Sequence, residues 1–191
     1  MLFRSMGIAE IVTMPVPNAS IALVYPGVKR DSPEFFAAYL MNEVLGGGTF
    51  SSRLYKQVRE QRGLAYSVYS SLATLEHTAY LIAGTSTRAE NRDEAIQLMR
   101  DEIRKLSEDG VTQEEFDAAK KFVIGAYAIN NLDTSSKIAR VLVSLQVQDL
   151  GIDYINRRKS IIEAVTLEDV NNIARELLSV EPTQVVVGPE K

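Results

Sequence analysis

The sequence predicts an α+β fold in which helices pack on one face of an antiparallel or mixed β-sheet. Apolar runs of strand length occur in the first half of the chain, and amphipathic helical periodicity dominates the second half. A last apolar run, Gln184–Val187, is bounded by Pro182 and Gly188 and is expected to return to the sheet. Because no linker, internal repeat or low-complexity segment interrupts these 191 residues, we expect one domain spanning residues 1–191.

Four further strands are expected before the helical half. Ile8–Thr13 and Ser20–Tyr25 are apolar runs separated by prolines and an asparagine, which are turn residues. Ala65–Ala73 and Thr78–Thr85 are rich in Tyr, Val, Leu and Ile, and Glu76-His77 lies near the turn between them. The second pair is therefore predicted to form a β-hairpin.

Two capping boxes give the most specific helix starts in the second half. Thr112 with Glu115, and Thr166 with Asp169, each place a hydroxyl and a carboxylate where they can satisfy free N–H groups at a helix start. Between the two boxes, polar residues at 130–134 interrupt a long helical stretch. The second half is therefore expected to be mostly helical, with a break near its middle.

The composition excludes several classes of function. A net charge of −4 and an isoelectric point near 5.2 give no basic patch of the kind that binds nucleic acid, so no nucleic-acid partner is expected. No apolar stretch approaches the roughly 20 residues that a membrane-spanning helix needs. The absence of cysteine excludes disulfides and thiolate metal sites. The N-terminus does not look like a signal peptide, which favours a soluble cytoplasmic protein, with a periplasmic or organellar location as the alternatives.

A glycine run, Gly46 to Gly48 followed by Thr49, lies between two predicted helices, one beginning near Ser32 and a shorter one ending at Gly63. The run lacks the G-K-[ST] ending of a phosphate-binding loop and follows a helix instead of a strand, so nucleotide binding is not expected. Its simplest interpretation is a tight turn between helices that needs positive φ values.

Histidine content decides whether this chain can hold a catalytic zinc ion. Zinc peptidases of the H-E-x-x-H or H-x-x-E-H type need two histidines on one helix face with a carboxylate, and this chain has one histidine, His77. A lone histidine near a strand turn is expected to be a surface residue. The same shortage, with no G-x-S-x-G elbow, removes a Ser/His/Asp arrangement. We therefore expect no metal and no cofactor on this chain, and no catalysis by the chain alone.

The most informative stretch runs from Leu45 to Val68 and reads LGGGTFSSRLYKQVREQRGLAYSV. Its order of glycine turn, S-R-L, R-x-x-x-G-L and aromatic strand resembles the second, non-zinc domain of insulinase/pitrilysin metallopeptidases, a family that includes the mitochondrial processing peptidase subunits. Three later segments are similar to the same family: GVTQEEFDAAK from Gly110, AVTLEDV from Ala164 and VVVGP from Val185. The resemblance therefore covers nearly the whole chain.

The resemblance implies roles for particular residues. In the family, an arginine and a tyrosine at the positions of Arg59 and Tyr66 are directed from the second domain toward the zinc site of the first, so these two are the candidate catalytic residues. A guanidinium can hold a carbonyl or carboxylate, and a phenol can donate a hydrogen bond to an oxyanion. The candidate substrate contacts occupy the place of the glycine-rich loop of processing peptidases: Gly46, Gly47, Gly48 and Thr49.

The resemblance also implies partners. In the family, a zinc-bearing homologous domain or subunit encloses a chamber with a domain like this one, so zinc is expected on that partner and a peptide is the expected substrate. Extended peptides bind along strand edges, for which Ser67–Ser71 and Ala79–Ala83 are the candidates. Family subunits usually hold two such domains, so this chain is either a fragment of a longer protein or a separate subunit. A lone domain would expose its partner face, which favours a homodimer.

Three hypotheses follow. The first is the substrate-binding half of a zinc-dependent endopeptidase, assisted by Arg59 and Tyr66. The second is a non-proteolytic scaffold or peptide-binding subunit, since some members of the family have lost proteolysis. The third is an α+β domain with an unrelated ligand, which would gain support if the Arg59 and Tyr66 side chains pointed in different directions.

Overall fold

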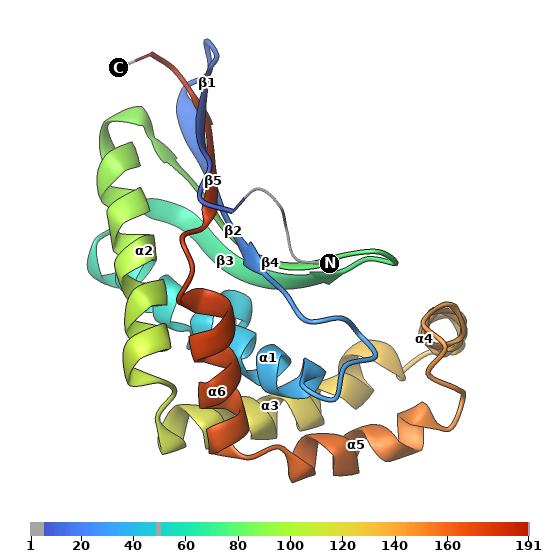
Figure 1. Cartoon of the computed structure of the whole chain (residues 1–191). Coiled ribbons are helices and arrows are strands. Elements are labelled where there is room, and N and C mark those ends of the chain that lie inside the picture. The colour runs from blue at the N-terminus through green and yellow to red at the C-terminus, as the bar shows by residue number, and fades with distance from the viewer. Residues whose placement is uncertain (1–5, 49–50, 191) are drawn as a thin grey trace.

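A mixed β-sheet forms the centre of the domain (Figure 1). The computed structural model describes residues 6–48 and 51–190. β1 pairs with β5 in parallel, and the other neighbouring strands are antiparallel. The predicted sheet, its β3–β4 hairpin and its returning last strand are confirmed. The strands lie in the order β1-β5-β2-β4-β3, with the bounds β1 Ala9–Thr13, β2 Asn18–Pro26, β3 Ala65–Thr74, β4 Ala79–Arg88 and β5 Thr183–Gly188.

Helices cover one face of this sheet, and no helix among the residues described covers the other (Figure 1). α2 and α6 pack against β2, α1 packs against β3, and α3 lies against α1 in a second layer with α4 and α5. The expected α+β arrangement with helices on one face is confirmed. The helical elements are α1 Phe35–Asn42, η1 Glu43–Gly47, η2 Tyr55–Gln61, η3 Ala89–Asn91, α2 Arg92–Asp109, α3 Gln113–Asn131, α4 Ser135–Val147, α5 Tyr154–Ala164 and α6 Leu167–Leu178.

Alternation along β2 explains why the sheet has a covered face and an open face. Ile21, Leu23 and Tyr25 are buried in the core, whereas Ser20 is exposed and Ala22 is half-buried. Successive side chains of a strand point to opposite faces, so one face of β2 carries the apolar core and the other, with Ser20 and Ala22, is open. Full burial of a side chain such as Leu23 contributes roughly 1.5–3 kcal/mol to folding.

Both predicted capping boxes form. The Thr112 hydroxyl accepts a hydrogen bond from the Glu115 N–H at 3.2 Å, and the Thr166 hydroxyl accepts one from the Asp169 N–H at 3.1 Å. In each box the carboxylate in turn accepts from the backbone N–H of the threonine at 2.9 Å. Two free donors are therefore satisfied at each helix start, which is why these local patterns predicted α3 and α6 correctly.

The long helical stretch between the boxes is broken twice. The predicted interruption separates α3 from α4, where Thr134 caps the new helix by accepting a hydrogen bond from the Lys137 N–H. A second break, which the periodicity did not predict, separates α4 from α5. Asp149 and Gly151 adopt φ values of 54° and 75° there, and such left-handed backbone ends a helix.

A π-helical segment, η1, includes Gly46 and Gly47 of the glycine run, and a second one, η2, follows the run. α1 continues directly into η1, and the predicted short helix is η2; π-helical turns are rare and recur at functional sites. The expectation of positive φ values in the glycine run is wrong, since none of residues 46–48 has one. Glycine is required at position 46 for close approach, because a Cβ there would lie 2.5 Å from the Ser70 backbone nitrogen.

Candidate functional site

Arg59 and Tyr66 come from two elements joined by a sharp turn. Arg59 lies in η2, and Tyr66 is the second residue of β3. Between them Gly63 has a φ of 62°, and its N–H donates to the Arg59 carbonyl oxygen at 3.0 Å. A glycine with positive φ ends a helix abruptly, so the chain turns back and the strand starts beside the helix. The predicted end of the short helix at Gly63 is confirmed.

A β-bulge then turns Tyr66 outward. On β3, Ala65 pairs with Thr87 and Val68 pairs with Thr85, so these two pairs enclose one more residue on β3 than on β4. An extra residue bends a strand and re-aims its side chains, and bulges of this kind are frequent beside active sites. The Tyr66 side chain is 84% exposed, which leaves its hydroxyl accessible to a ligand or a partner surface.

The two candidate catalytic side chains meet. The guanidinium carbon of Arg59 lies 4.9 Å from the ring centre of Tyr66 and 4.9 Å from that of Tyr55, within the range of cation–π attraction. Within the part of the chain that the structure describes, no carboxylate forms an ion pair with Arg59. Its N–H donors therefore remain available for a carbonyl or carboxylate. The Arg59 and Tyr66 side chains therefore do not point in different directions, which was the arrangement that would have supported an unrelated ligand.

The candidate substrate contacts of the glycine run differ in their surroundings. Gly46 is buried against Ser70, Gly47 is exposed, and Gly48 lines a cavity of about 730 Å³. Thr49 lies outside the described residues. Contact between this run and a substrate stays a prediction; Gly47 is exposed, and Gly48 is a buried residue in the cavity wall.

The cavity beside the glycine run opens between η1, η2 and α3. Burial raises the pKa of the Glu43 carboxyl group in its wall. Carboxylates, one lysine and an apolar surface share the lining, which suits a group with both polar and apolar parts. The lining residues are Glu43, Val44, Gly48, Ser51, Lys56, Thr112, Glu114, Glu115, Ala118, Ala119 and Phe122.

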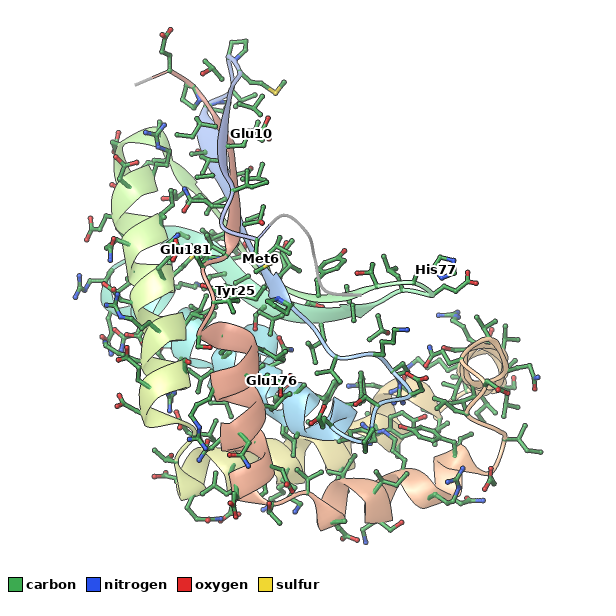
Figure 2. All side chains as sticks on the ribbon, viewed as in Figure 1. Met6, Glu10, Tyr25, His77, Glu176 and Glu181 are labelled. Atoms are coloured by element: carbon green, nitrogen blue, oxygen red, sulfur yellow. The ribbon has the colours of Figure 1, made fainter. Side chains whose placement is uncertain are left out.

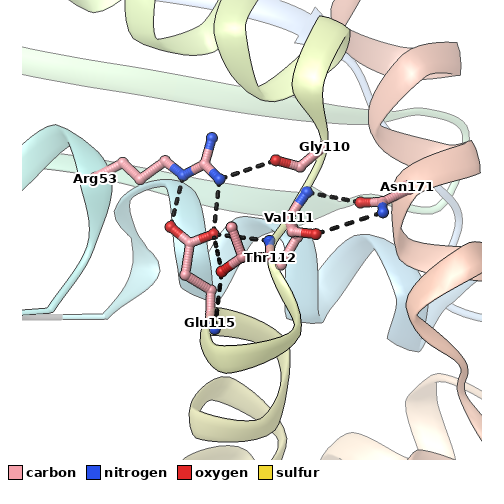
Figure 3. Close-up of polar contacts among 6 residues, drawn as sticks. All are labelled: Arg53, Gly110, Val111, Thr112, Glu115 and Asn171. Carbon is pink, nitrogen blue, oxygen red and sulfur yellow. Dashed lines mark hydrogen bonds and ion pairs between the residues drawn. The ribbon is translucent and has the colours of Figure 1, made fainter.

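A network around Arg53 fixes the chain just before η2 (Figure 3). Arg53 donates to both carboxylate oxygens of Glu115 at 2.7 Å and to the Gly110 carbonyl oxygen at 2.9 Å. Burial raises the pKa of the Glu115 carboxyl group, but hydrogen bonds from Arg53 and Thr112 outweigh burial and lower this pKa to about 2. Asn171 of α6 accepts a hydrogen bond from the same turn at 2.7 Å. The network joins the segment just before η2, the α2–α3 turn and α6.

Tyr55 and Arg53 were not among the predicted site residues. Tyr55 precedes Arg59 by four positions, and this spacing could have identified it, because residues four apart share a helix face. Arg53 belongs to the S-R-L motif, but its partner Glu115 is 62 positions away. No local pattern connects two residues that far apart, so only the structure could assign that pair.

The lone histidine is a surface residue. His77 lies at the tip of the β3–β4 hairpin (Figure 2), its side chain is 87% exposed, and its Nε2 lies 3.7 Å from the Glu76 carboxylate. Among residues 6–48 and 51–190, no three His, Cys, Asp or Glu side chains are grouped so that they could hold a metal ion. In the same part of the chain, no helix has the length and apolar character to cross a membrane.

Of the two candidate peptide-binding edges, one is a true edge. β4 pairs with β2 on one side and with β3 on the other, so Ala79–Ala83 offers no free edge. β3 is the last strand of the described sheet, so Ser67–Ser71 lies on an edge. Free main-chain groups on such a strand can bind an extended peptide. The exposed side chains of Tyr66 and Tyr69 lie on the same strand.

Residues 7–123 match the family model of the peptidase M16 inactive domain. The chain is 31% identical over 190 residues to an uncharacterised zinc protease of Streptomyces coelicolor, a match that covers 98% of this chain and 40% of that protein. It is 30% identical over 162 residues to a non-peptidase homologue from Helicobacter pylori, a match that covers 81% of this chain and 36% of that protein. The chain thus spans about two fifths of the length of these curated relatives.

The fold has a counterpart among solved structures. A peptidase M16 inactive domain from Pseudomonas fluorescens superposes with a TM-score of 0.88 at 28% identity, covering 97% of this chain and 44% of that one. The expected fold and the resemblance to a non-zinc domain of this peptidase family are confirmed. The more particular likeness to processing peptidase subunits stays a prediction, as does the extent of the domain over residues 1–191.

Proposed function

The chain belongs to the peptidase M16 family, as one of its inactive domains, and we propose that it is the substrate-binding half of a zinc-dependent endopeptidase. In this proposal Arg59 and Tyr66 assist catalysis at a zinc site carried by a partner domain. The observation that carries the proposal is the contact of an arginine that has no acidic partner among the described residues with an exposed tyrosine at the sheet edge.

The two side chains have complementary tasks in peptide hydrolysis. Zinc on the partner domain, when bound, supplies an activated water and polarises the scissile carbonyl. The Arg59 guanidinium holds a neighbouring carbonyl or a terminal carboxylate of the peptide through its fork of N–H donors. The Tyr66 hydroxyl donates a hydrogen bond to the scissile carbonyl oxygen as negative charge develops on it. Because the two groups are in contact, one peptide can engage both.

The edge of β3 is the proposed track for the peptide backbone. An extended peptide that pairs with Ser67–Ser71 would gain main-chain hydrogen bonds that require no particular sequence. Tyr66 precedes this segment directly, and Arg59 of η2 contacts the Tyr66 ring. A peptide bound along the edge therefore passes the proposed catalytic pair.

The open face of the sheet is the proposed docking surface for the zinc-bearing domain. Small or short side chains, Ser20 and Ala22 on β2 and Ser86 on β4, lie beside Val187 on β5 and the half-exposed ring of Tyr69 on β3. Together they line a shallow depression of about 340 Å³. Small residues flanked by larger ones suit an apolar element of the partner domain. In a lone chain the same face would favour homodimers.

The proposal is tested by kinetics on the chain reassembled with its zinc-bearing partner domain. Arg59→Ala and Tyr66→Phe are each expected to lower kcat by roughly 10²-fold, the scale for losing one oxyanion donor. Arg62→Ala is the matched control. Arg62 is exposed, and its ion pair with Glu94, at 3.8 Å, lies on the surface. Turnover at the wild-type rate in both test variants would refute the catalytic assignment.

A second candidate is a non-proteolytic scaffold or peptide-binding subunit. The Helicobacter pylori relative, at 30% identity, is described as a non-peptidase homologue, which supports this second candidate. The same kinetic series separates the two candidates. The scaffold would be favoured by a complex that forms through this chain and shows no peptidase activity, provided that its assembly is unchanged by the Arg59 and Tyr66 substitutions.

A further inference from the structure

Tyr55 lies beside the proposed catalytic pair without belonging to it. It is the first residue of η2 and is 8% exposed, whereas Tyr66 is 84% exposed. Both ring centres lie 4.9 Å from the Arg59 guanidinium carbon. Arg59 therefore contacts one ring that is fixed in the core and one ring that faces outward.

The kind of contact decides what the Arg59 guanidinium can still bind. A carboxylate fixes a guanidinium by occupying its N–H groups, as Glu115 does with Arg53. An aromatic face attracts the cation through its quadrupole and leaves the fork of N–H donors free. Within the described residues, no ion pair or side-chain hydrogen bond of Arg59 competes with an incoming carbonyl.

We propose that Tyr55 is a positioning residue: its buried ring fixes the Arg59 guanidinium beside Tyr66 while leaving the guanidinium donors free for a carbonyl or carboxylate of the substrate peptide. This inference rests on the proposed function of Arg59. The backbone supports it, because Tyr55 and Arg59 stand four positions apart in one π-helical segment and the Gly63 turn brings Tyr66 onto the same guanidinium.

The first test observes Arg59 by NMR in the chain alone. Tyr55→Leu removes the ring and is expected to move the Arg59 side-chain proton signals away from their ring-shielded positions, whereas Tyr55→Phe keeps the ring and the signals. Val58→Ala is the matched control, since Val58 is fully buried in the same helix and contributes packing without a ring. Unchanged Arg59 signals in Tyr55→Leu would overturn the inference, and so would an equal change in Val58→Ala.

The second test measures activity in the chain reassembled with its zinc-bearing partner. Tyr55→Leu is expected to lower kcat/KM by up to about 10²-fold, the cost of a misplacement of about 1 Å, and Tyr55→Phe is expected to retain the wild-type value. If Arg59→Ala is impaired and Tyr55→Leu is not, the positioning role alone fails. A Tyr55→Phe variant as impaired as Tyr55→Leu would assign the effect to the hydroxyl and overturn the ring-based inference.

The two levels of failure can be told apart. If Arg59→Ala and Tyr66→Phe both turn over at the wild-type rate, the proposed function fails and the positioning role fails with it, whatever the NMR signals show. If both are impaired, the Tyr55 series decides the positioning role independently.

Discussion

Two arginines six positions apart have opposite surroundings. Arg53 engages both carboxylate oxygens of Glu115 and the Gly110 carbonyl, and its side chain is 17% exposed. Among the described side chains, Arg59 contacts the rings of Tyr55 and Tyr66 and no carboxylate. The Arg53 guanidinium uses its N–H donors to hold neighbouring segments together, whereas the N–H donors of Arg59 remain available to a ligand. The partner, more than the residue type, separates a structural arginine from a candidate functional one.

The largest expected effect is on stability at Arg53. Arg53→Ala leaves the Glu115 carboxylate and the Gly110 carbonyl without their donor, so we expect the free energy of unfolding to fall by roughly 2–3 kcal/mol. Urea denaturation measures it. Arg62→Ala, which breaks only an exposed pair with Glu94, is the control and should cost at most about 0.5 kcal/mol. Equal losses in the two variants would mean that the Arg53 network stabilises no more than a surface contact.

The second-largest expected effect is a loss of stabilisation by the Arg53 network at low pH. The pKa of Glu115 is about 2 in the folded chain, below the 4.5 of a free glutamate, so the folded state favours the charged carboxylate. Stabilisation by a lowered pKa is fully present above about pH 5 and is lost as the pH falls toward 2. The stability difference between wild type and Glu115→Gln should therefore shrink over that range. Parallel pH curves for the two proteins would contradict this assignment of the pKa.

Of the two arginines compared, Arg59 is expected to contribute less to stability. Arg59→Ala loses only contacts with two rings, which contribute about 0.5–1 kcal/mol at an accessible site. In the same urea series we expect a loss of no more than about 1 kcal/mol, although the activity of the reassembled enzyme falls. A loss as large as that of Arg53→Ala would show that Arg59 is structural, and the contrast between the two arginines would disappear.

The sequence predicted those features whose physical cause is local. The capping boxes at Thr112 and Thr166 satisfy donors within one turn. Arg59 and Tyr66 were named together through the family resemblance; the Gly63 turn brings their side chains into contact, and their catalytic role stays a prediction. The contact of Arg53 with Glu115 joins positions 62 apart and had no local signal. The glycine run was misread for a related reason, because Gly46 is required by the approach of Ser70 from another element and not by its own φ.

Strand pairing shows the same limit. The sequence offered two candidate edges, and nothing in Ser67–Ser71 or Ala79–Ala83 distinguishes an outer strand from an inner one. The difference depends on β2, which pairs with β4 from the other side. Neighbours in a sheet are set by tertiary packing, whereas apolar periodicity reports only that a segment is a strand.

The placement of β5 has a consequence for how the chain folds. β5, at the C-terminal end of the described chain, lies between β1 and β2, which come first in the sequence and do not pair with each other. During synthesis the backbone of β1 therefore has no strand to pair with until residues 183–188 have been made. Contacts between such distant segments slow folding, because a long loop must close first. Completion of the sheet is thus a late event, and a chain that stops short of β5 leaves β1 unpaired and prone to aggregation.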